Sequence, residues 1–135
     1  MCDCINYSLN MQSKSTRAKK IMIVDDEPAI AETLQFILEE EGYSVMTSSD
    51  GTVLEKYMNG STPDLILLDY WLPKKNGDEI AKALKSRKDT QHIPIIMMSA
   101  SNNIRDIARE AGVNDFIPKP FDCEDIIDKV HTYTN

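Results

Sequence analysis

The sequence predicts an α/β domain in which strand–helix units repeat around a doubly wound parallel sheet. Short apolar runs alternate with segments of helical period, and this alternation is the pattern of βα repeats. The run at residues 65–68 is apolar at every position, as expected for a strand that is buried on both faces of a parallel sheet. Glycine or proline breaks the chain between several of these segments, which places turns where the repeats require them.

The first strand and helix are predicted at residues 20–24 and 28–41. A proline at the first helical position is favourable because its missing N–H is not needed there, and Gly42 is a typical residue for ending a helix. The second strand and helix are expected at residues 43–47 and about 52–58. One apolar face of the first helix follows the spacing i, i+4, i+7 and i+8 and contains Ile30, Leu34, Ile37 and Leu38.

The second half of the chain predicts three further strand–helix units. The segment Gly60-Ser61-Thr62-Pro63 separates them from the first half, and Gly112 is placed to end the fourth helix. The remaining expected elements are strands at 64–69, 94–98 and 115–117 and helices at 78–86, 104–111 and 123–132. The apolar face of the last helix is expected to contain Cys123, Ile126, Ile127 and Val130.

Composition limits the possible functions. The chain has 135 residues and a net charge of -7, which disfavours direct nucleic-acid binding because neutralising phosphates requires clustered Lys and Arg. Its apolar runs are too short to span a bilayer, and its start lacks the apolar stretch of a signal peptide. The three cysteines do not form a disulfide framework. We therefore expect a cytoplasmic protein with a flexible tail at residues 1–18 and one domain at residues 19–135.

Several predicted strands lead into residues with phosphate or metal chemistry. Asp25 and Asp26 follow the first strand, Asp69 ends the third, Ser99 follows the fourth, and Lys119 comes just after the fifth. Ligands of an open parallel sheet bind beyond the carboxyl ends of its strands, so these side chains are expected to converge. Adjacent carboxylates repel one another unless a cation lies between them, and Mg²⁺ is the usual hard cation. An aspartate beside such a cation can accept a phosphoryl group.

Each of these residues also has an ordinary explanation. The acidic pair could cap the following helix, where Asp is favoured, and Asp69 could be a turn residue. Ser99 could begin a loop, and Lys119 could be an exposed lysine. These explanations are adequate one at a time. They explain poorly why all of these residues stand at corresponding strand ends, so we prefer the functional interpretation.

At these positions the sequence resembles the receiver domain of two-component response regulators, and in particular single-domain regulators of chemotaxis or of sporulation relays. The resemblance covers roughly residues 19–133, and the motifs are highly specific as an ordered set. The matching segments are IVDDEP at 23–28, DLILLD at 64–69, LP at 72–73, NG at 76–77, PIIMMSA at 94–100 and AGVNDFIPKPF at 111–121.

The resemblance implies a flavodoxin-like (βα)5 fold with a five-stranded parallel sheet in the order 2-1-3-4-5. It also implies that Asp69 is the phosphoacceptor. Asp25 and Asp26 match the acidic pair that holds Mg²⁺, with Asp69 and the backbone carbonyl of Trp71 as the other protein ligands. The implied function is to accept a phosphoryl group and to switch partner binding or relay the phosphate, without being an enzyme in the ordinary sense.

Further residues match the switch of this family. Ser99 corresponds to the switch hydroxyl, Lys119 to the lysine that contacts the phosphoryl group, and Phe116 to the aromatic residue that turns inward on activation. The Lys119–Pro120 peptide bond is usually cis in the family, which X–Pro bonds tolerate. Phe116 lacks the hydroxyl of a tyrosine switch, so its inward state must depend on packing. Trp71 is expected to pack over or beside the site and to slow the attack of water on the aspartyl phosphate.

The implied partners are a sensor histidine kinase or histidine phosphotransfer protein and a downstream effector protein, with Ile30 and Ala31 as candidate docking contacts. A monomer or weak dimer is expected. Two alternatives stay open: a phosphorylation-independent interaction module of this fold, and a receiver fragment of a larger regulator. A Mg²⁺-dependent phosphohydrolase is disfavoured because Trp71 stands where its general acid would be needed. A flavin or dinucleotide domain is disfavoured because no Gly-rich loop follows the first strand.

Overall fold

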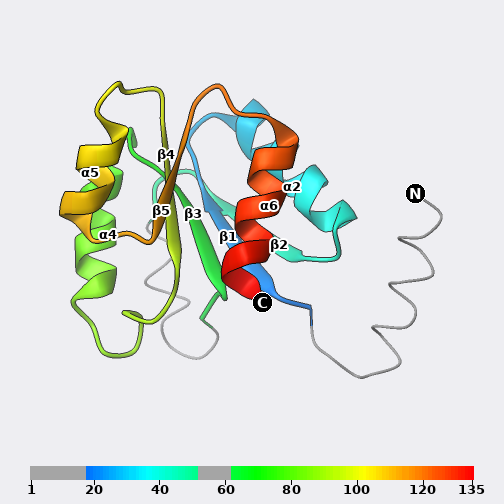
Figure 1. The fold of residues 1–135 in the computed structure, drawn as a ribbon, viewed down its shortest axis with the longest axis horizontal. Coiled ribbons are helices and arrows are strands. Elements are labelled where there is room, and N and C mark those ends of the chain that lie inside the picture. Colours follow the sequence, from blue (N-terminus) through cyan, green and yellow to red (C-terminus); the bar gives the residue numbers. More distant parts are fainter. Residues whose placement is uncertain (1–17, 52–61) are drawn as a thin grey trace.

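A computed structural model of the chain describes residues 18–51 and 62–135. Within these residues, the strands form one parallel sheet of five strands in the order β2-β1-β3-β4-β5 (Figure 1), which confirms the expected order. This order makes β1 and β3 neighbours, with β4 on the other side of β3. The strands are β1 (Lys20–Val24), β2 (Ser44–Ser48), β3 (Leu65–Asp69), β4 (Ile95–Ser99) and β5 (Asp115–Pro118).

Helices cover both faces of the sheet. Figure 1 shows α4 and α5 together on one side and α2 and α6 on the other, which is the doubly wound arrangement that the sequence predicts. Gly42, with a φ of 94°, follows α2 and allows the chain to turn into β2. The described helices are α2 (Pro28–Glu40), α4 (Gly77–Lys85), α5 (Ile104–Ala111) and α6 (Cys123–Thr134).

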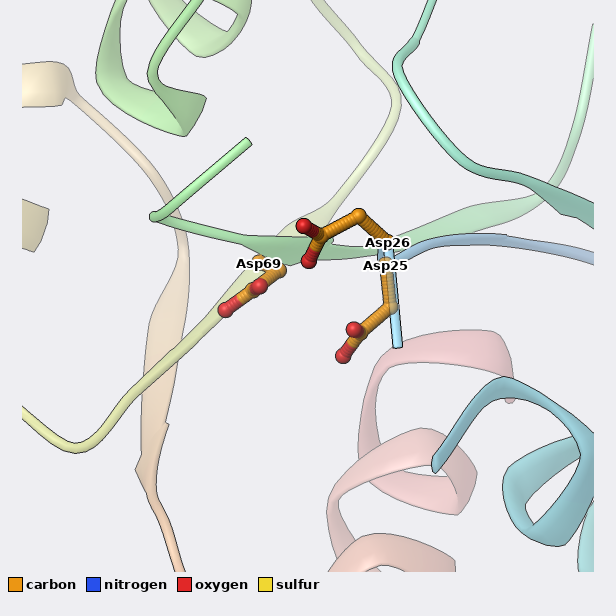
Figure 2. A group of neighbouring side chains, drawn as sticks. All are labelled: Asp25, Asp26 and Asp69. Carbon is orange, nitrogen blue, oxygen red and sulfur yellow. The ribbon is translucent and has the colours of Figure 1, made fainter. Parts of the chain in front are cut away.

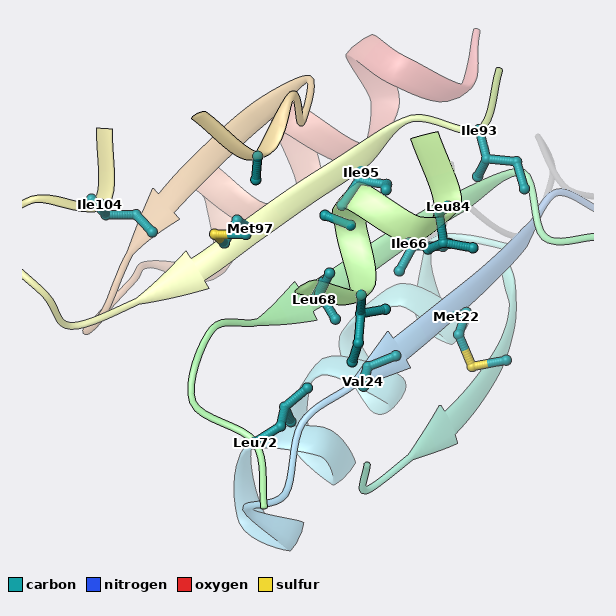
Figure 3. Packing of buried hydrophobic residues seen from close by; sticks show 13 residues of the cluster. Met22, Val24, Ile66, Leu68, Leu72, Leu84, Ile93, Ile95, Met97 and Ile104 are labelled. Atoms are coloured by element: carbon teal, nitrogen blue, oxygen red, sulfur yellow. The ribbon is translucent and has the colours of Figure 1, made fainter. Parts of the chain in front are cut away.

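Alternate residues of the central strands supply two separate apolar cores. In β3, Ile66 and Leu68 pack with α4 and α5, and Figure 3 shows this cluster. Leu65 and Leu67 pack with α2 and α6 on the opposite face. All five residues of β3 are buried, as the uniform apolar run predicts. The carboxyl end of β3 is therefore held in place by apolar packing on both faces of the sheet.

The start of β3 is fixed to β1 by a pair of polar contacts. The backbone N–H of Lys20 donates to the Asp64 carboxylate at 2.8 Å, and the backbone N–H of Asp64 donates to the Lys20 carbonyl oxygen at 2.8 Å. From there the register runs from Ile21 opposite Leu65 to Val24 opposite Leu68. The residues that follow β1 thus come to lie beside the last residue of β3.

The structure shifts some expected element ends by one or two residues. Ser99 lies inside β4 and is fully buried, so it does not simply begin a loop. The α4 helix begins at Gly77, one residue earlier than expected. Cys123 begins α6 but is exposed, so the expectation that it belongs to the apolar face of that helix is wrong. The expected helix at about 52–58 and residues 1–17 of the expected tail lie outside the described residues.

Candidate functional site

Three aspartates meet at the carboxyl edge of the sheet. Asp25 and Asp26 follow β1 and Asp69 ends β3, and Figure 2 shows how their side chains gather there. One carboxylate oxygen from each residue lies within 4.8 Å of the others. Asp25 and Asp69 are only 2% and 4% exposed, whereas Asp26 is exposed to solvent. The structure therefore brings together the three acidic residues that the sequence predicts as a group.

Asp25 is held by contacts at both its backbone and its side chain. Its backbone N–H donates to the Ser48 carbonyl oxygen at 3.0 Å, which extends the pairing of β1 with β2. Its Oδ1 accepts a hydrogen bond from the Glu27 N–H at 2.9 Å, just before α2. The N-cap position of α2 is Glu27, and no side chain caps this helix, so the capping explanation is wrong for Asp25: its bond closes a short turn before the helix. The other oxygen faces the site.

Lys119 brings a positive charge to this acidic group. Its Nζ lies 3.0 Å from Oδ2 of Asp25 and 3.2 Å from Oδ1 of Asp69, and its side chain is only 12% exposed. Its backbone N–H donates to the Ser99 carbonyl oxygen at 2.9 Å, which ties the end of β5 to the end of β4. The Lys119–Pro120 peptide bond is cis, as the family resemblance predicts. Lys119 is therefore largely buried and paired with carboxylates, and it is not an ordinary surface lysine.

The charges of the site do not balance. Burial, together with the neighbouring charge of Asp25, raises the pKa of Asp69 to about 6, although Lys119 acts in the opposite direction. Burial alone would lower the pKa of Lys119, but its hydrogen bond with Asp25 and the charge of Asp69 more than offset this, so its pKa is raised. One ammonium facing several carboxylates leaves an excess of negative charge. A further cation would relieve it.

The donor set fits a hard divalent cation. Carboxylate oxygens are the ligands that Mg²⁺ prefers, and at about 2.1 Å from the ion they lie at most about 4.2 Å from one another. The oxygens of the three aspartates span at most 4.8 Å, so a small closing movement is enough to form such a site. The exposed position of Asp26 leaves an open side, which suits an ion that keeps several of its waters.

Ser99 and Phe116 lie on the neighbouring strands β4 and β5, with Ser99 at the carboxyl end of β4 and Phe116 opposite Met97, two residues nearer the amino edge. Ser99 is fully buried at the end of β4, and its Oγ accepts a hydrogen bond from the Ser101 N–H at 3.0 Å. Phe116 lies in β5, is half-buried and packs against the core on the side of α4 and α5. The guanidinium carbon of Arg105 lies 5.8 Å from the centre of the Phe116 ring, within the range of a cation–π contact.

Trp71 stands beside the site without being buried in it. Its side chain is 60% exposed, and its ring meets the Tyr70 ring edge to face with 4.9 Å between the centroids. A few residues further on, Nζ of Lys74 lies 3.6 Å from Oδ2 of Asp50, so the loop after β3 is linked to the loop after β2. The expectation that the tryptophan packs over or beside the site stays a prediction.

Sequence reasoning missed two residues at the site, Glu27 and Gly77, and one exposed residue on α2, Phe36. Oε1 of Glu27 lies 3.6 Å from Nζ of Lys119, and this long-range pair has no signal in the sequence. Gly77 packs against the backbone at the end of β3, which only the geometry reveals. Phe36 on α2 is 67% exposed. It could have been found, because it falls outside the apolar face predicted for that helix.

Fold and site together define a class of protein: doubly wound α/β domains whose functional residues lie at the carboxyl ends of the strands, next to the point where the strand order reverses. Within that class, a sequence model of the response regulator receiver domain matches residues 21–131. The chain belongs to the response regulator receiver domain family, and the resemblance noted in the sequence is confirmed.

Individual relatives agree with this assignment. The chain is 41% identical over 110 residues to the alkaline phosphatase synthesis transcriptional regulatory protein PhoP of Bacillus subtilis, covering 80% of this chain and 45% of that protein. A signal receiver domain of a histidine kinase from Syntrophus aciditrophicus matches with a TM-score of 0.80 and 31% identity, covering 87% and 90% of the two chains. The phosphorylated cyanobacterial phytochrome response regulator RcpA matches with a TM-score of 0.72 and 32% identity, covering 86% and 91%.

The chain is thus a receiver domain homologous to regulators of two-component signalling. It spans about half the length of the curated relatives that it matches. In the part of the chain that the structure describes, none of the helices has the length and apolar character needed to cross a membrane.

Proposed function

We propose that Asp69 accepts a phosphoryl group from a phosphohistidine of a sensor kinase or phosphotransfer protein. The observation that carries this proposal is the buried Asp69 carboxylate, placed between two further aspartates and the Lys119 ammonium. A carboxylate oxygen of Asp69 forms the new O–P bond, and the N–P bond of the donor breaks with its electron pair returning to the imidazole. Nζ of Lys119 lies 3.2 Å from Oδ1 of Asp69, where it can pair with an oxygen of the incoming phosphoryl group.

The proposed ligands of Mg²⁺ are Asp25, Asp26, Asp69 and the backbone carbonyl of Trp71. When bound, the ion neutralises charge on the transferring phosphoryl group. Asp25 is suited to hold its ligand oxygen in place because its other oxygen is fixed by the Glu27 N–H. We propose that this chemistry takes place in a single cytoplasmic domain at residues 19–135, preceded by a tail at residues 1–18.

The proposed switch connects the phosphoryl group to a surface on the far side of β4. A phosphoryl oxygen draws the Ser99 hydroxyl away from its present partner, the Ser101 N–H. The space that this movement frees lets Phe116 turn inward, away from the Arg105 guanidinium. The face built from α5, β5 and α6 then differs between the two states, and an effector protein that prefers one state reads the difference. A monomer or weak dimer is sufficient for this mechanism.

The donor is proposed to dock on α2, the helix that begins directly after the acidic pair. Ala31 is only 8% exposed, so of the two contacts expected from the sequence only half-buried Ile30 can contribute much. Phe36 offers a larger apolar surface at 67% exposure. The proposed partner, a helical bundle that carries the phosphohistidine, covers Phe36 while it presents its histidine to Asp69.

The docking proposal predicts that Phe36→Ser slows phosphotransfer from the cognate phosphohistidine donor by about tenfold or more, because an exposed aromatic anchor is lost. Its reaction with acetyl phosphate should stay unchanged, since this small donor needs no docking surface. Rapid-quench assays with both donors measure the two rates. Equal slowing with both donors would show that the substitution disturbs the site itself and not the docking of a partner.

The proposed function is tested by incubating the protein with acetyl phosphate and Mg²⁺, followed by intact mass measurement. We expect a phosphate adduct that hydroxylamine removes, as an acyl phosphate requires, and no adduct on the Asp69→Ala variant. Chelation of Mg²⁺ should abolish the adduct on the wild type. A wild type that stays unmodified with acetyl phosphate and also with a phosphohistidine donor would instead identify a phosphorylation-independent module.

A further inference from the structure

The backbone at the end of β3 is packed directly against the first residue of α4. The N–H of Gly77 donates to the Tyr70 carbonyl oxygen at 2.7 Å. A Cβ atom at position 77 would overlap the Asp69 carbonyl oxygen and would lie 3.0 Å from the Cα of Tyr70. We propose that Gly77 is a positioning residue for the metal site, which holds the backbone of residues 69–71 where Asp69 and the Trp71 carbonyl can bind one ion together.

The requirement for glycine at position 77 is a matter of space. Among the glycines of residues 18–51 and 62–135, those with a positive φ are Gly42, Gly51 and Gly112, and Gly77 is not one of them. Other residues could therefore adopt the backbone conformation of Gly77, and any side chain would still meet the β3 backbone. The atoms that it would meet are main-chain atoms of Asp69, the last residue of a strand buried on both faces, and of Tyr70, which follows it, so they cannot swing aside as the end of a flexible side chain can.

Tyr70, the residue whose carbonyl Gly77 contacts, is also anchored through its own N–H. The Tyr70 N–H donates to the Met98 carbonyl oxygen in β4 at 2.9 Å, while the Tyr70 carbonyl oxygen accepts from Gly77. Tyr70 is thus held between β4 and α4. Trp71 follows immediately, and because its side chain is 60% exposed, its own packing fixes it only weakly. The place of the Trp71 carbonyl accordingly depends on Tyr70 and, through Tyr70, on Gly77.

This role differs from simply starting a helix. Asn76 precedes α4, and its N–H donates to the Glu79 carboxylate at 3.3 Å, so the helix start has a polar capping contact that does not involve the Gly77 N–H. The Gly77 N–H is instead used to close the loop onto Tyr70. A purely structural role predicts a loss of stability alone. A positioning role predicts weaker metal binding in protein that is still folded.

The inference rests on the proposed function and is tested by Mg²⁺ binding to the full chain, with no phosphoryl donor present. Trp71 is the only tryptophan, so its fluorescence reports on the site during a Mg²⁺ titration. We expect Gly77→Ala to raise the Mg²⁺ dissociation constant by about tenfold or more, as loss of groups that orient metal ligands typically does. The matched control is Gly42→Ala. It introduces the same methyl group at a positive φ of 94° with no atom within 4 Å, and should lower Tm while leaving Mg²⁺ affinity near that of the wild type.

A second variant adds no atoms and so avoids the risk that Gly77→Ala fails to fold. Replacing the amide of residue 77 by an ester through protein semisynthesis removes the N–H that binds Tyr70, and should also weaken Mg²⁺ binding several-fold. Mg²⁺ affinity equal to the wild type in the ester variant, or in folded Gly77→Ala, would overturn the inference. Absence of Mg²⁺ binding by the wild type itself would overturn the proposed metal site, and the inference with it.

Discussion

The pKa of an aspartate is shifted in opposite directions at the two edges of the sheet. At the carboxyl edge, Asp69 faces Asp25 with Lys119 as a shared cation, and its pKa is raised to about 6. At the amino edge, Asp115 accepts hydrogen bonds from the Lys129 ammonium at 3.0 Å and the Tyr133 hydroxyl at 3.0 Å. Burial pushes the pKa of Asp115 upward, but these bonds and the Phe116 N–H hold it below its ordinary value.

The amino edge extends this pattern of paired polar groups to its neighbours. Nζ of Lys85 donates to the Ile93 carbonyl oxygen at 2.8 Å and to Oδ1 of Asn114 at 2.9 Å, and the same Asn114 oxygen accepts from the Ile95 N–H. One edge of the sheet thus satisfies its polar groups within the chain, whereas the other keeps an excess of negative charge. This contrast separates the amino edge, which anchors the fold, from the carboxyl edge, which is suited to bind a ligand.

The largest expected effect on stability comes from removing the negative charge of Asp69 at the carboxyl edge. Without metal at about pH 7.5, Asp69→Asn should be more stable than the wild type by roughly 2–3 kcal/mol, because a pKa change of one is worth about 1.4 kcal/mol. The pKa of Asp69 is higher in the folded protein than in the unfolded chain. Its contribution to stability is therefore fully present at pH values below the pKa of the unfolded chain, and it is lost as the pH rises through about 6. The advantage of the variant should therefore vanish near pH 4. Urea unfolding across this pH range measures it.

A change in stability of the opposite sign is expected at the amino edge, where the charges are paired. Asp115→Asn should destabilise the protein at neutral pH by about 1 kcal/mol, a modest value because solvent screens the partly exposed pair with Lys129. The pKa of Asp115 is lower in the folded protein than in the unfolded chain. Its contribution to stability is therefore present at pH values above the pKa of the unfolded chain, and it is lost as the pH falls through the pKa of the folded protein. The same urea series measures both variants. If the two substitutions shift stability in the same direction, the contrast between the two edges is wrong.

The smallest expected effect concerns the rim of the carboxyl edge. Trp71→Asn should shorten the lifetime of the phosphoryl group on Asp69 by roughly threefold to tenfold, corresponding to about 1 kcal/mol in the barrier, because a polar side chain gives water easier access beside the site. Loss of radioactive phosphate from the purified phosphoprotein measures this rate. An unchanged lifetime would mean that the exposed ring does not shield the acyl phosphate. Tyr133→Phe at the opposite edge is the matched control and should leave the lifetime unaltered.

The sequence predicted much of the fold and the grouping of the three aspartates for one reason: parallel strands place their carboxyl ends at the same edge. A uniform run such as that of β3 needs no tertiary information to be recognised as buried. The approach of Glu27 to Lys119 and the close packing of Gly77 on the β3 backbone depend on how separate segments meet in space. Helical periodicity failed for Cys123, which begins α6, because the first turn of a helix can leave the core.

The uniform hydrophobicity of β3 affects how insertions and deletions act. A strand written LILLD is apolar on both faces, so a slip of one residue would cost little hydrophobic burial while exchanging the side chains that the two faces present. Polar residues mark its two ends: Asp64, bonded to the backbone of Lys20, and Asp69. Polar residues thus define both ends of a strand whose interior is uniformly apolar. Adding or removing one residue within 65–68 would leave the core composition nearly intact and turn the Asp69 carboxylate toward the wrong layer of helices.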